Sequence, residues 1–263
     1  MASLKIGIFD SGIGGLTVAK AIKTEMPKAS LVYFGDTAHL PYGDKSPASI
    51  RHYSARITQF LLSHHCNALV IACNTASAHA YKTVKDIAGP NIPVFNVIDP
   101  VVETISEKYS NQKIGIIATK GTIKTRVYPN RIKKANASIK VASKSTPLLA
   151  PMIEEGFFNN TISKAVINSY LNARELKKIK ALVLGCTHYP LIYNEVDNYF
   201  NGEVNIINSA SVVAKHIKKT LKKRPSETEN DYFFVSDFTK AFEESTQTFF
   251  GDSIHLDEVR IFD

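Results

Sequence analysis

Short apolar runs alternate with helix-length segments in this chain, and that alternation limits what it can fold into. The apolar runs have the length of buried strands, and the segments between them end in helix-stop signals such as Pro27 and the pair Gly89-Pro90. The predicted strands are residues 4–9, 31–34, 68–72 and 93–97, and the predicted helices are residues 16–26, 48–63 and 76–88. Strands that alternate with helices predict a mostly parallel sheet with helices on both faces.

The same pattern occurs a second time. Residues 113–117 (KIGII) resemble residues 5–9 (KIGIF), and residues 182–187 (LVLGCT) resemble residues 69–74 (LVIACN). The two offsets are nearly equal, so the repeat predicts two similar α/β halves. Each half ends its third recognisable strand in a cysteine followed by a small polar residue.

The repeat also predicts how the chain divides into domains. The second half ends near residue 207; a helix at 210–221, a polar loop at 222–231, a strand at 232–235 and a helix at 238–249 follow. The simplest path of the chain brings these C-terminal elements back to the first half. We therefore expect a discontinuous first domain, residues 1–97 plus 208–263, and a second domain of residues 98–207. The predicted fold class is α/β, with two similar domains whose mostly parallel sheets face each other across a cleft. Ligands bind beyond the carboxyl ends of such strands.

Composition excludes several classes of protein. With 263 residues, 44% hydrophobic and 21% charged, the chain is neither disordered nor fibrous. Its longest apolar run, at 68–73, is far shorter than the ~20 residues of a membrane helix. The N-terminal residues lack an apolar signal region, which predicts a cytoplasmic protein without a membrane partner. The net charge of +8 is concentrated at 177–180 and 215–224, where basic residues suit helix C-termini; this favours a solvated face over a nucleic-acid site.

The cysteines do not form a disulfide framework or a metal site. There are three, Cys66, Cys73 and Cys186, and none lies in a C-x-x-C pair. His64 and His65 precede Cys66, but adjacent side chains point apart on a helix and cannot easily share one metal. We expect no metal and a structural role for Cys66.

Polar residues follow the predicted strands and are the candidates for chemistry. Asp10 and Ser11 precede a glycine-rich turn that matches neither a dinucleotide fingerprint nor a P-loop, yet could bind an anion. Cys73 follows the third strand and opens a helix, whose dipole is expected to lower the pKa of the thiol. Cys186 repeats this arrangement with His188 nearby, an imidazole that can exchange a proton near neutral pH.

Free cysteines are often simply small buried hydrophobes. Two of them at matching strand ends, each with a polar follower, favour reactive thiols. Thiols from two facing domains could remove a proton from one face of a carbon and return one to the other, which inverts a stereocentre. Neither cysteine motif contains a lysine, so nothing indicates a Schiff-base cofactor.

Four motifs together resemble the bacterial glutamate racemases. They are residues 10–16 (DSGIGGL), 41–43 (PYG), 72–76 (ACNTA) and 184–191 (LGCTHYPL), and the resemblance covers nearly the whole chain in order. His39-Leu40 stands where Arg-Phe is more usual. The resemblance implies interconversion of L- and D-glutamate without a cofactor, which supplies D-glutamate for peptidoglycan synthesis.

The resemblance also implies roles for individual residues. Cys73 would deprotonate D-glutamate and Cys186 would deprotonate L-glutamate. Asp10 and His188 match residues that assist the cysteines, and Asp36 and Glu154 match further catalytic carboxylates. The positions that match substrate-binding residues are Asp10, Ser11, Pro41, Tyr42, Gly43, Asn74, Thr75, Thr187 and His188.

Other functions stay open at this point. An aspartate, hydantoin or other amino-acid racemase of the same superfamily would share both cysteines. A hydrolase with a cysteine nucleophile would need only one of them, and a nucleic-acid-binding protein would use the basic helix end. The sequence leaves the oligomeric state open, with a homodimer among the options, and gives neither regulation nor rates.

Overall fold

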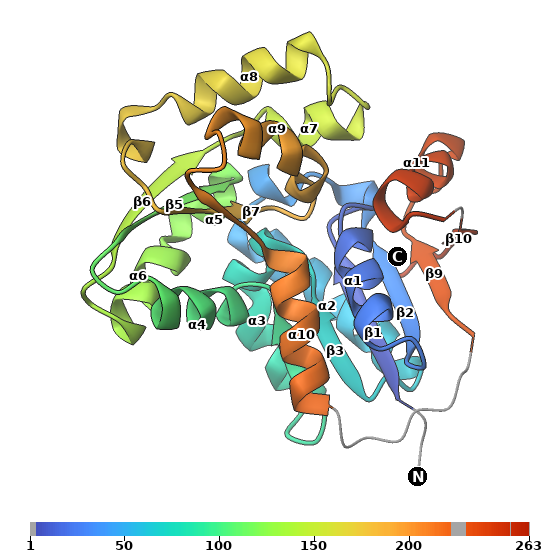
Figure 1. Ribbon diagram of the computed structural model, residues 1–263. Helices are drawn as coiled ribbons and strands as arrows, with labels where there is room; N and C mark the ends of the chain where they lie inside the picture. The colour runs from blue at the N-terminus through green and yellow to red at the C-terminus, as the bar shows by residue number, and fades with distance from the viewer. Residues whose placement is uncertain (1–3, 222–229, 253, 263) are drawn as a thin grey trace.

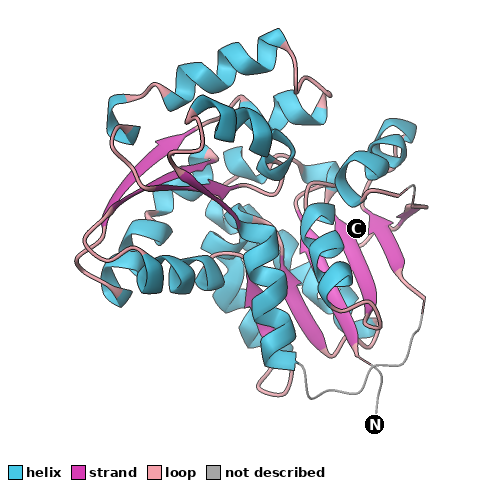
Figure 2. Cartoon of the chain, in the orientation of Figure 1, coloured by secondary structure: helices cyan, strands magenta, loops and turns pink. Residues whose placement is uncertain are grey.

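Two parallel sheets organise the computed structural model, which describes residues 4–221, 230–252 and 254–262 (Figures 1 and 2). The first sheet has the order β10-β9-β2-β1-β3-β4 and the second has the order β6-β5-β7-β8. Every strand pair in both sheets is parallel. This confirms the predicted α/β class.

The strands follow the apolar runs of the sequence. The first sheet comprises β1 (Lys5–Asp10), β2 (Ser30–Gly35), β3 (Ala68–Ile71), β4 (Val94–Asn96), β9 (Tyr232–Val235) and β10 (Asp257–Glu258). The second comprises β5 (Lys113–Ala118), β6 (Lys140–Ser145), β7 (Ala181–Gly185) and β8 (Asn205–Asn208). The strands β1, β2, β3 and β7 are almost wholly buried, as expected for strands covered on both faces.

Helices cover the sheets. The larger ones are α1 (Leu16–Glu25), α2 (Pro47–Ser63), α3 (Asn74–Ala88), α4 (Asp99–Lys108), α8 (Thr161–Leu171), α10 (Ser209–Leu221) and α11 (Lys240–Phe250). The shorter ones are α5 (Lys120–Thr125), α6 (Val127–Ala135), α7 (Leu149–Glu154) and α9 (Tyr193–Tyr199). No helix in the described ranges is both long and apolar enough to cross a membrane.

Side-chain caps set several helix boundaries and explain two differences from the prediction. Helix α3 begins at Asn74 rather than residue 76 because the Cys73 side chain caps it, and Gly89 ends it with φ 73°. Helix α11 begins at Lys240 rather than residue 238 because the Thr239 hydroxyl accepts from the Phe242 N–H. Of the predicted loop at 222–231, residues 222–229 lie outside the described residues.

The C-terminal part of the chain returns to the first sheet. Strand β9 pairs with β2 along Val32–Gly35. The first sheet therefore contains strands that come before the second sheet in the sequence and strands that come after it. Helix α10 packs mainly on α1 and also contacts α4, and it lies at the centre of Figure 1. These facts support our proposed division into residues 1–97 plus 208–263 and residues 98–207.

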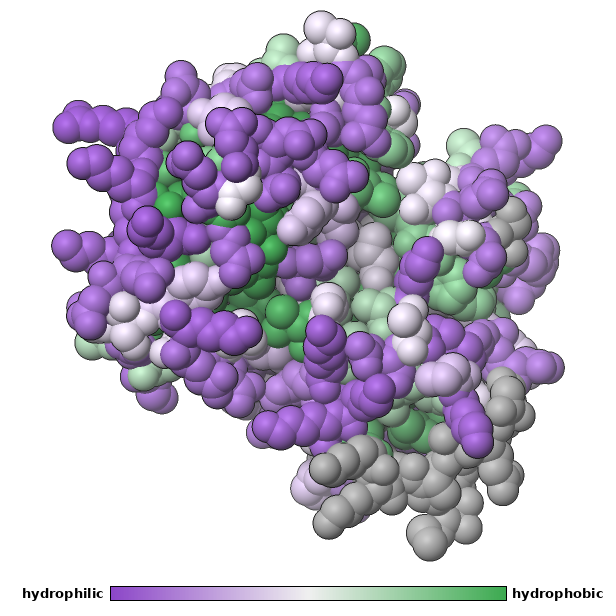
Figure 3. All heavy atoms as spheres, in the orientation of Figure 1, coloured by the Kyte–Doolittle hydropathy of each residue, from purple (hydrophilic) through white to green (hydrophobic). Residues whose placement is uncertain are grey.

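The apolar core also joins the two sheets. Its largest cluster contains Ile6 and Leu31 from the first sheet together with Leu182 and Leu184 from the second. By contrast, hydrophilic side chains dominate the face shown in Figure 3. The sheets are therefore held together by shared packing as well as by chain connections.

Candidate active site

Residues that follow four strands of the two sheets converge on one small cavity. Ser11 follows β1, Cys73 lies just after β3, and Thr119 and Cys186 follow β5 and β7 of the other sheet. The cavity has a volume of about 400 Å³. Its lining is Ser11, Leu40, Pro41, Tyr42, Gly43, Cys73, Asn74, Thr75, Thr119, Ala150, Glu154, Gly185, Cys186, Thr187 and His188. The cavity lies where a parallel sheet usually binds its ligand.

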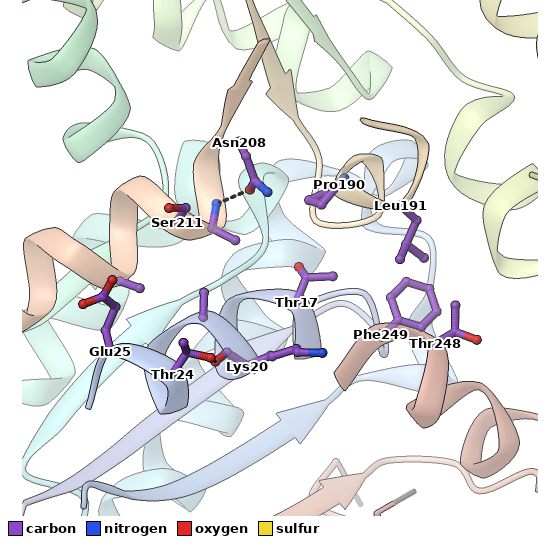
Figure 4. A pocket seen from close by; sticks show the side chains of 13 residues that line it. Thr17, Lys20, Thr24, Glu25, Pro190, Leu191, Asn208, Ser211, Thr248 and Phe249 are labelled. Atoms are coloured by element: carbon purple, nitrogen blue, oxygen red, sulfur yellow. Dashed lines mark hydrogen bonds between the residues drawn. The ribbon is translucent and has the colours of Figure 1, made fainter. Parts of the chain in front are cut away.

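A second, larger hollow lies between α1, α10 and α11 (Figure 4). Its volume is about 840 Å³, and among the residues that the structure describes its ionisable lining groups are Lys20 and Glu25 alone. Phe249 of α11 lies on one side of it, and the ring of Phe249 packs edge-on against the ring of His188 at 5.5 Å between centroids. Because neither Cys73 nor Cys186 lines this hollow, the smaller cavity is the candidate active site.

Cys73 occupies the N-terminus of α3. Its Sγ accepts from the Ala76 N–H at 3.4 Å and lies 3.7 Å from the Ser11 hydroxyl. Burial, reinforced by the negative charge of Asp10, raises the pKa of the Cys73 thiol to about 12. The expectation that the helix N-terminus lowers this pKa is therefore wrong, because the N–H contact is outweighed by the loss of water.

Asp10 lies behind the cavity and beside Cys73. The carboxylate is fully buried; Oδ2 accepts from the Gly15 N–H at 2.7 Å, while Oδ1 has no hydrogen-bond partner among the described residues. Burial raises the pKa of Asp10 above its ordinary value, although the nearby His188 opposes this. A side chain at position 15 would collide with Asp10, since its Cβ would lie 2.4 Å from the Asp10 Cβ. The glycine-rich turn thus allows the backbone to hold a buried carboxylate.

Cys186 forms a chain of contacts with an imidazole and a carboxylate. Its Sγ lies 3.5 Å from Nδ1 of His188, and Nε2 of His188 lies 2.8 Å from Oε1 of Glu154. Burial acts to lower the pKa of His188, but the adjacent Cys186 sulfur and Glu154 carboxylate raise it well above its ordinary value. The arrangement places a positively charged imidazolium beside the second thiol. The two cysteines therefore have opposite electrostatic surroundings.

Asp36 is located behind Tyr42 and does not line the cavity. Its Oδ2 accepts from the Tyr42 hydroxyl at 2.6 Å, and its Oδ1 lies 2.7 Å from the Ser236 hydroxyl and 2.8 Å from Nδ1 of His39. The His39 ring in turn stacks on Tyr53 at 4.0 Å. These bonds place Asp36 to hold the loop that carries Tyr42.

The second sheet contributes hydroxyl groups that sequence reasoning missed. Thr119 caps α5, lines the cavity, and has its Oγ1 3.0 Å from Oγ1 of Thr75. The internal repeat held the signal, because the offset between residues 5 and 113 makes Thr119 the counterpart of Ser11. Leu40, Ala150 and Gly185 are the other lining residues that were not predicted.

Most of the predicted site residues are brought together. Eleven of the thirteen line the cavity, and Asp10 and Asp36 lie directly behind it. Within the described part of the chain, no group of three or more His, Cys, Asp or Glu side chains could hold a metal ion. The chemistry available in the cavity is that of two thiols, an imidazole, carboxylates and hydroxyl groups.

Known proteins resemble this chain in sequence over most of its length. The family model described as "Asp/Glu/Hydantoin racemase" matches residues 16–217. The glutamate racemase of a Sulfurihydrogenibium species is 38% identical over 261 residues, which cover 99% of this chain and 98% of the relative. That of Aquifex aeolicus is 43% identical over 231 residues, 88% of each chain. The chain belongs to the glutamate racemases.

A solved structure of a glutamate racemase shares the same fold. The enzyme from Francisella tularensis, crystallised in complex with D-glutamate, aligns with a TM-score of 0.91 and 35% identity, covering 99% of this chain and 98% of its own. The overall fold of this enzyme is therefore the one seen here.

Proposed function

We propose that this protein interconverts L- and D-glutamate by a two-base reaction in which Cys73 and Cys186 act on opposite faces of the substrate α-carbon. The observation that carries the proposal is that two thiols, from equivalent strand ends of two sheets, line one small cavity. One thiol supplies a base, and the other supplies a proton. The proposal needs no cofactor.

The surroundings of the two thiols differ in a way that suits different roles. The raised pKa of Cys73 favours a neutral thiol there, since burial and Asp10 both oppose a negative charge. Beside Cys186 lies His188, which Glu154 holds through Nε2. With L-glutamate, Cys186 takes the α-proton and Cys73 donates a proton to the opposite face. D-glutamate requires the opposite pair, with Asp10 assisting Cys73.

The substrate α-proton is very weakly acidic, so the cavity must stabilise a developing negative charge. Hydroxyl groups of Thr75, Thr119 and Thr187 and the amide of Asn74 line the cavity and can donate to substrate carboxylates. Fixed donors in a site that excludes water stabilise such charge more strongly than water does. We assign these groups to carboxylate binding.

The biological setting forms part of the same proposal. D-glutamate made by this reaction would enter peptidoglycan synthesis. We place the enzyme in the cytoplasm, where D-glutamate would be built into the precursors.

We also propose a homodimer in solution. Light scattering coupled to size-exclusion chromatography tests this, and a monomer at all working concentrations would contradict it.

The deciding experiment follows circular dichroism of L-glutamate incubated with the protein. The protein is first dialysed and treated with a metal chelator, and no cofactor is added. We expect the signal to decay to zero as the racemate forms, and an unchanged signal would contradict the proposal. Restoration of a lost activity by pyridoxal phosphate or zinc would contradict the cofactor-independent mechanism.

The same assay separates glutamate from aspartate. We expect kcat/KM to be much higher for glutamate, because the relatives compared here are glutamate racemases. Equal values for the two amino acids would show that the substrate assignment is wrong and would favour a broader amino-acid racemase.

A further inference from the structure

The amide of Asn74 is bonded through one of its two polar atoms only. Its Oδ1 accepts a hydrogen bond from the Tyr128 hydroxyl at 2.8 Å. Its Nδ2 is buried and has no hydrogen-bond partner among the described residues. The side chain is 3% exposed and lines the catalytic cavity. A buried donor without a protein partner is costly, and such a group in a cavity wall is placed to bind a ligand.

Tyr128 is held firmly in the second domain. It lies on α6, is 1% exposed and belongs to an apolar cluster that includes Ile98, Val101 and Ile132. Burial raises the pKa of Tyr128, so its hydroxyl keeps its proton and can donate at any working pH. The ring is thus fixed by packing, and the position of its hydroxyl is fixed with it.

This hydrogen bond and a bound carboxylate together set which way the Asn74 amide faces. A phenol can donate to the oxygen of the amide or accept from its NH₂ group, so it can pair with either side. A carboxylate can only accept, so a carboxylate in the cavity needs the NH₂ group of the amide to face it. In the structure the amide has this orientation, because the Tyr128 hydroxyl donates to Oδ1. The bond from Tyr128 therefore holds the amide in the orientation in which Nδ2 is free for a ligand.

We propose that Tyr128 is a positioning residue, which holds the Asn74 amide with Nδ2 aimed at a carboxylate of bound glutamate. The inference rests on the proposed racemase function. Asn74 begins α3 of the first domain and Tyr128 lies on α6 of the second. The orientation of a substrate-binding donor in one domain is thus set by the other domain.

The effect is expected mainly in turnover. Charge spreads onto the substrate α-carboxylate as the α-proton leaves, so a donor at that carboxylate contributes most in the transition state. A donor that is present but badly aimed costs roughly tenfold to a hundredfold in rate. We expect Tyr128→Phe to lower kcat by that factor and to change KM less than threefold.

A double-mutant cycle tests whether Tyr128 acts through Asn74. The variants are Tyr128→Phe, Asn74→Ala and the double variant, each assayed for kcat and KM with L-glutamate. We expect the double variant to match Asn74→Ala, because the amide that Tyr128 positions is already gone. If the fold-losses in kcat of the two single variants multiply in the double variant, the inference is overturned, since Tyr128 would then act by another route.

The matched control is Tyr109→Phe. The Tyr109 hydroxyl accepts from Nδ2 of Asn205 at 2.6 Å, so this variant also loses a bond between a buried tyrosine and an asparagine in the second domain, but away from the catalytic cavity. Its kcat should equal that of the wild type. A loss like that of Tyr128→Phe would overturn the inference by showing a general structural effect.

One measurement does not depend on how the variants fold. In the wild-type protein, the side-chain amide resonance of Asn74 should shift when D-glutamate is added, and a resonance that stays in place overturns the inference. Wild-type protein without racemase activity would overturn the proposed function instead. Active wild type with an unaffected Tyr128→Phe variant would overturn this inference alone.

Discussion

Cys73 and Cys186 occupy similar positions at the ends of strands, but each has a different neighbour. Cys73 lies beside the buried carboxyl of Asp10, and Cys186 lies beside the imidazole of His188. The second half of the chain has Ala118 where the repeat would place a counterpart of Asp10. The two halves therefore place a cysteine at matching strand ends but give it different charged neighbours, which suits a reaction that needs a base and an acid together.

The two thiols give the most direct prediction at this scale. Cys73→Ser and Cys186→Ser should each lower kcat by about 10²–10⁴-fold, because a serine hydroxyl is a poor base near neutral pH. KM should change little, since serine is small enough to preserve the cavity. Turnover is measured in both directions, with far-UV circular dichroism to confirm folding.

Cys66→Ser is the control for both variants. Cys66 is 3% exposed, packs in an apolar cluster with residues of the first sheet, and does not line the cavity. Its turnover should remain within a few-fold of the wild type. A folded Cys186→Ser enzyme at full rate would eliminate the two-base mechanism, and a folded but inactive Cys66→Ser enzyme would show that a site thiol was misassigned.

Asp10→Asn should stabilise the protein while it impairs the reaction. Because burial raises the pKa of Asp10, the folded state holds the proton more tightly than the unfolded state, and stability falls as the pH rises through that raised pKa. The neutral Asn avoids this loss, so at about pH 7 the variant should have a free energy of unfolding about 1 kcal/mol higher, a usual gain when a strained functional group is removed.

Urea unfolding at two pH values checks this prediction. The advantage of Asp10→Asn should shrink as the pH is lowered, because wild-type Asp10 takes up its proton and its buried charge is lost. Asp86→Asn is the control, because Asp86 is exposed and pairs with Lys82 at the surface. An advantage that is the same at both pH values would exclude the buried charge as its cause.

The loop that carries Tyr42 depends on a segment far away in sequence. The Ser236 hydroxyl, just after β9, donates to Asp36 and accepts from the Ala38 N–H at 2.9 Å. The Thr37 hydroxyl donates to the Asp237 carbonyl at 2.6 Å and accepts from the Asp237 N–H at 2.9 Å. These bonds fix Asp36, and Asp36 fixes Tyr42 in the cavity wall.

Ser236→Ala should therefore loosen substrate binding without removing any group from the cavity. We expect KM for glutamate to rise by roughly three- to tenfold, the cost of one lost ordinary hydrogen bond, with kcat nearly unchanged. Steady-state kinetics provide the measurement. Ser245→Ala, which removes a hydroxyl bonded within α11, should leave both constants unchanged; a normal KM in Ser236→Ala would refute the role of the segment.

Elements with a strong local signal could be predicted, and those that depend on packing could not. The strands β1, β3 and β7 are apolar because both of their faces are buried, so they stand out in the sequence. The strand β6 is half-exposed and reads as a polar segment, and β10 is only two residues long. Neither was predicted.

The same distinction applies to the site. Cys73 and Cys186 were identified from strand-end position, which the sequence contains. The pKa of Cys73 was misjudged because the helix dipole is local, whereas the burial that outweighs it comes from distant residues. The bond between Tyr128 and Asn74 joins residues 54 positions apart and leaves no local pattern.

At the scale of the whole molecule, the first sheet is built from residues that come before and after the second sheet in the sequence. Strand β9 covers the edge of β2, and Phe233 and Val235 join the apolar core. A chain that stops at residue 221 should therefore expose the apolar edge of β2, lose activity and aggregate, as unpaired apolar edges do. Size-exclusion chromatography and the racemase assay test this, with the full chain as control; a compact, active truncated chain would refute it.

The interleaved order of the two sheets has a consequence for how the protein is made. All strands of the second sheet lie within residues 113–208, so a ribosome delivers them as one continuous piece. The first sheet keeps an unpaired edge at β2 until residues 232–258 have left the ribosomal exit tunnel. Since the cavity wall depends on Ser236, the nascent chain acquires its catalytic centre late in synthesis. The rate of translation of the C-terminal residues then determines how long an inactive intermediate with an unpaired strand edge persists. Chaperones would bind the nascent chain in that interval.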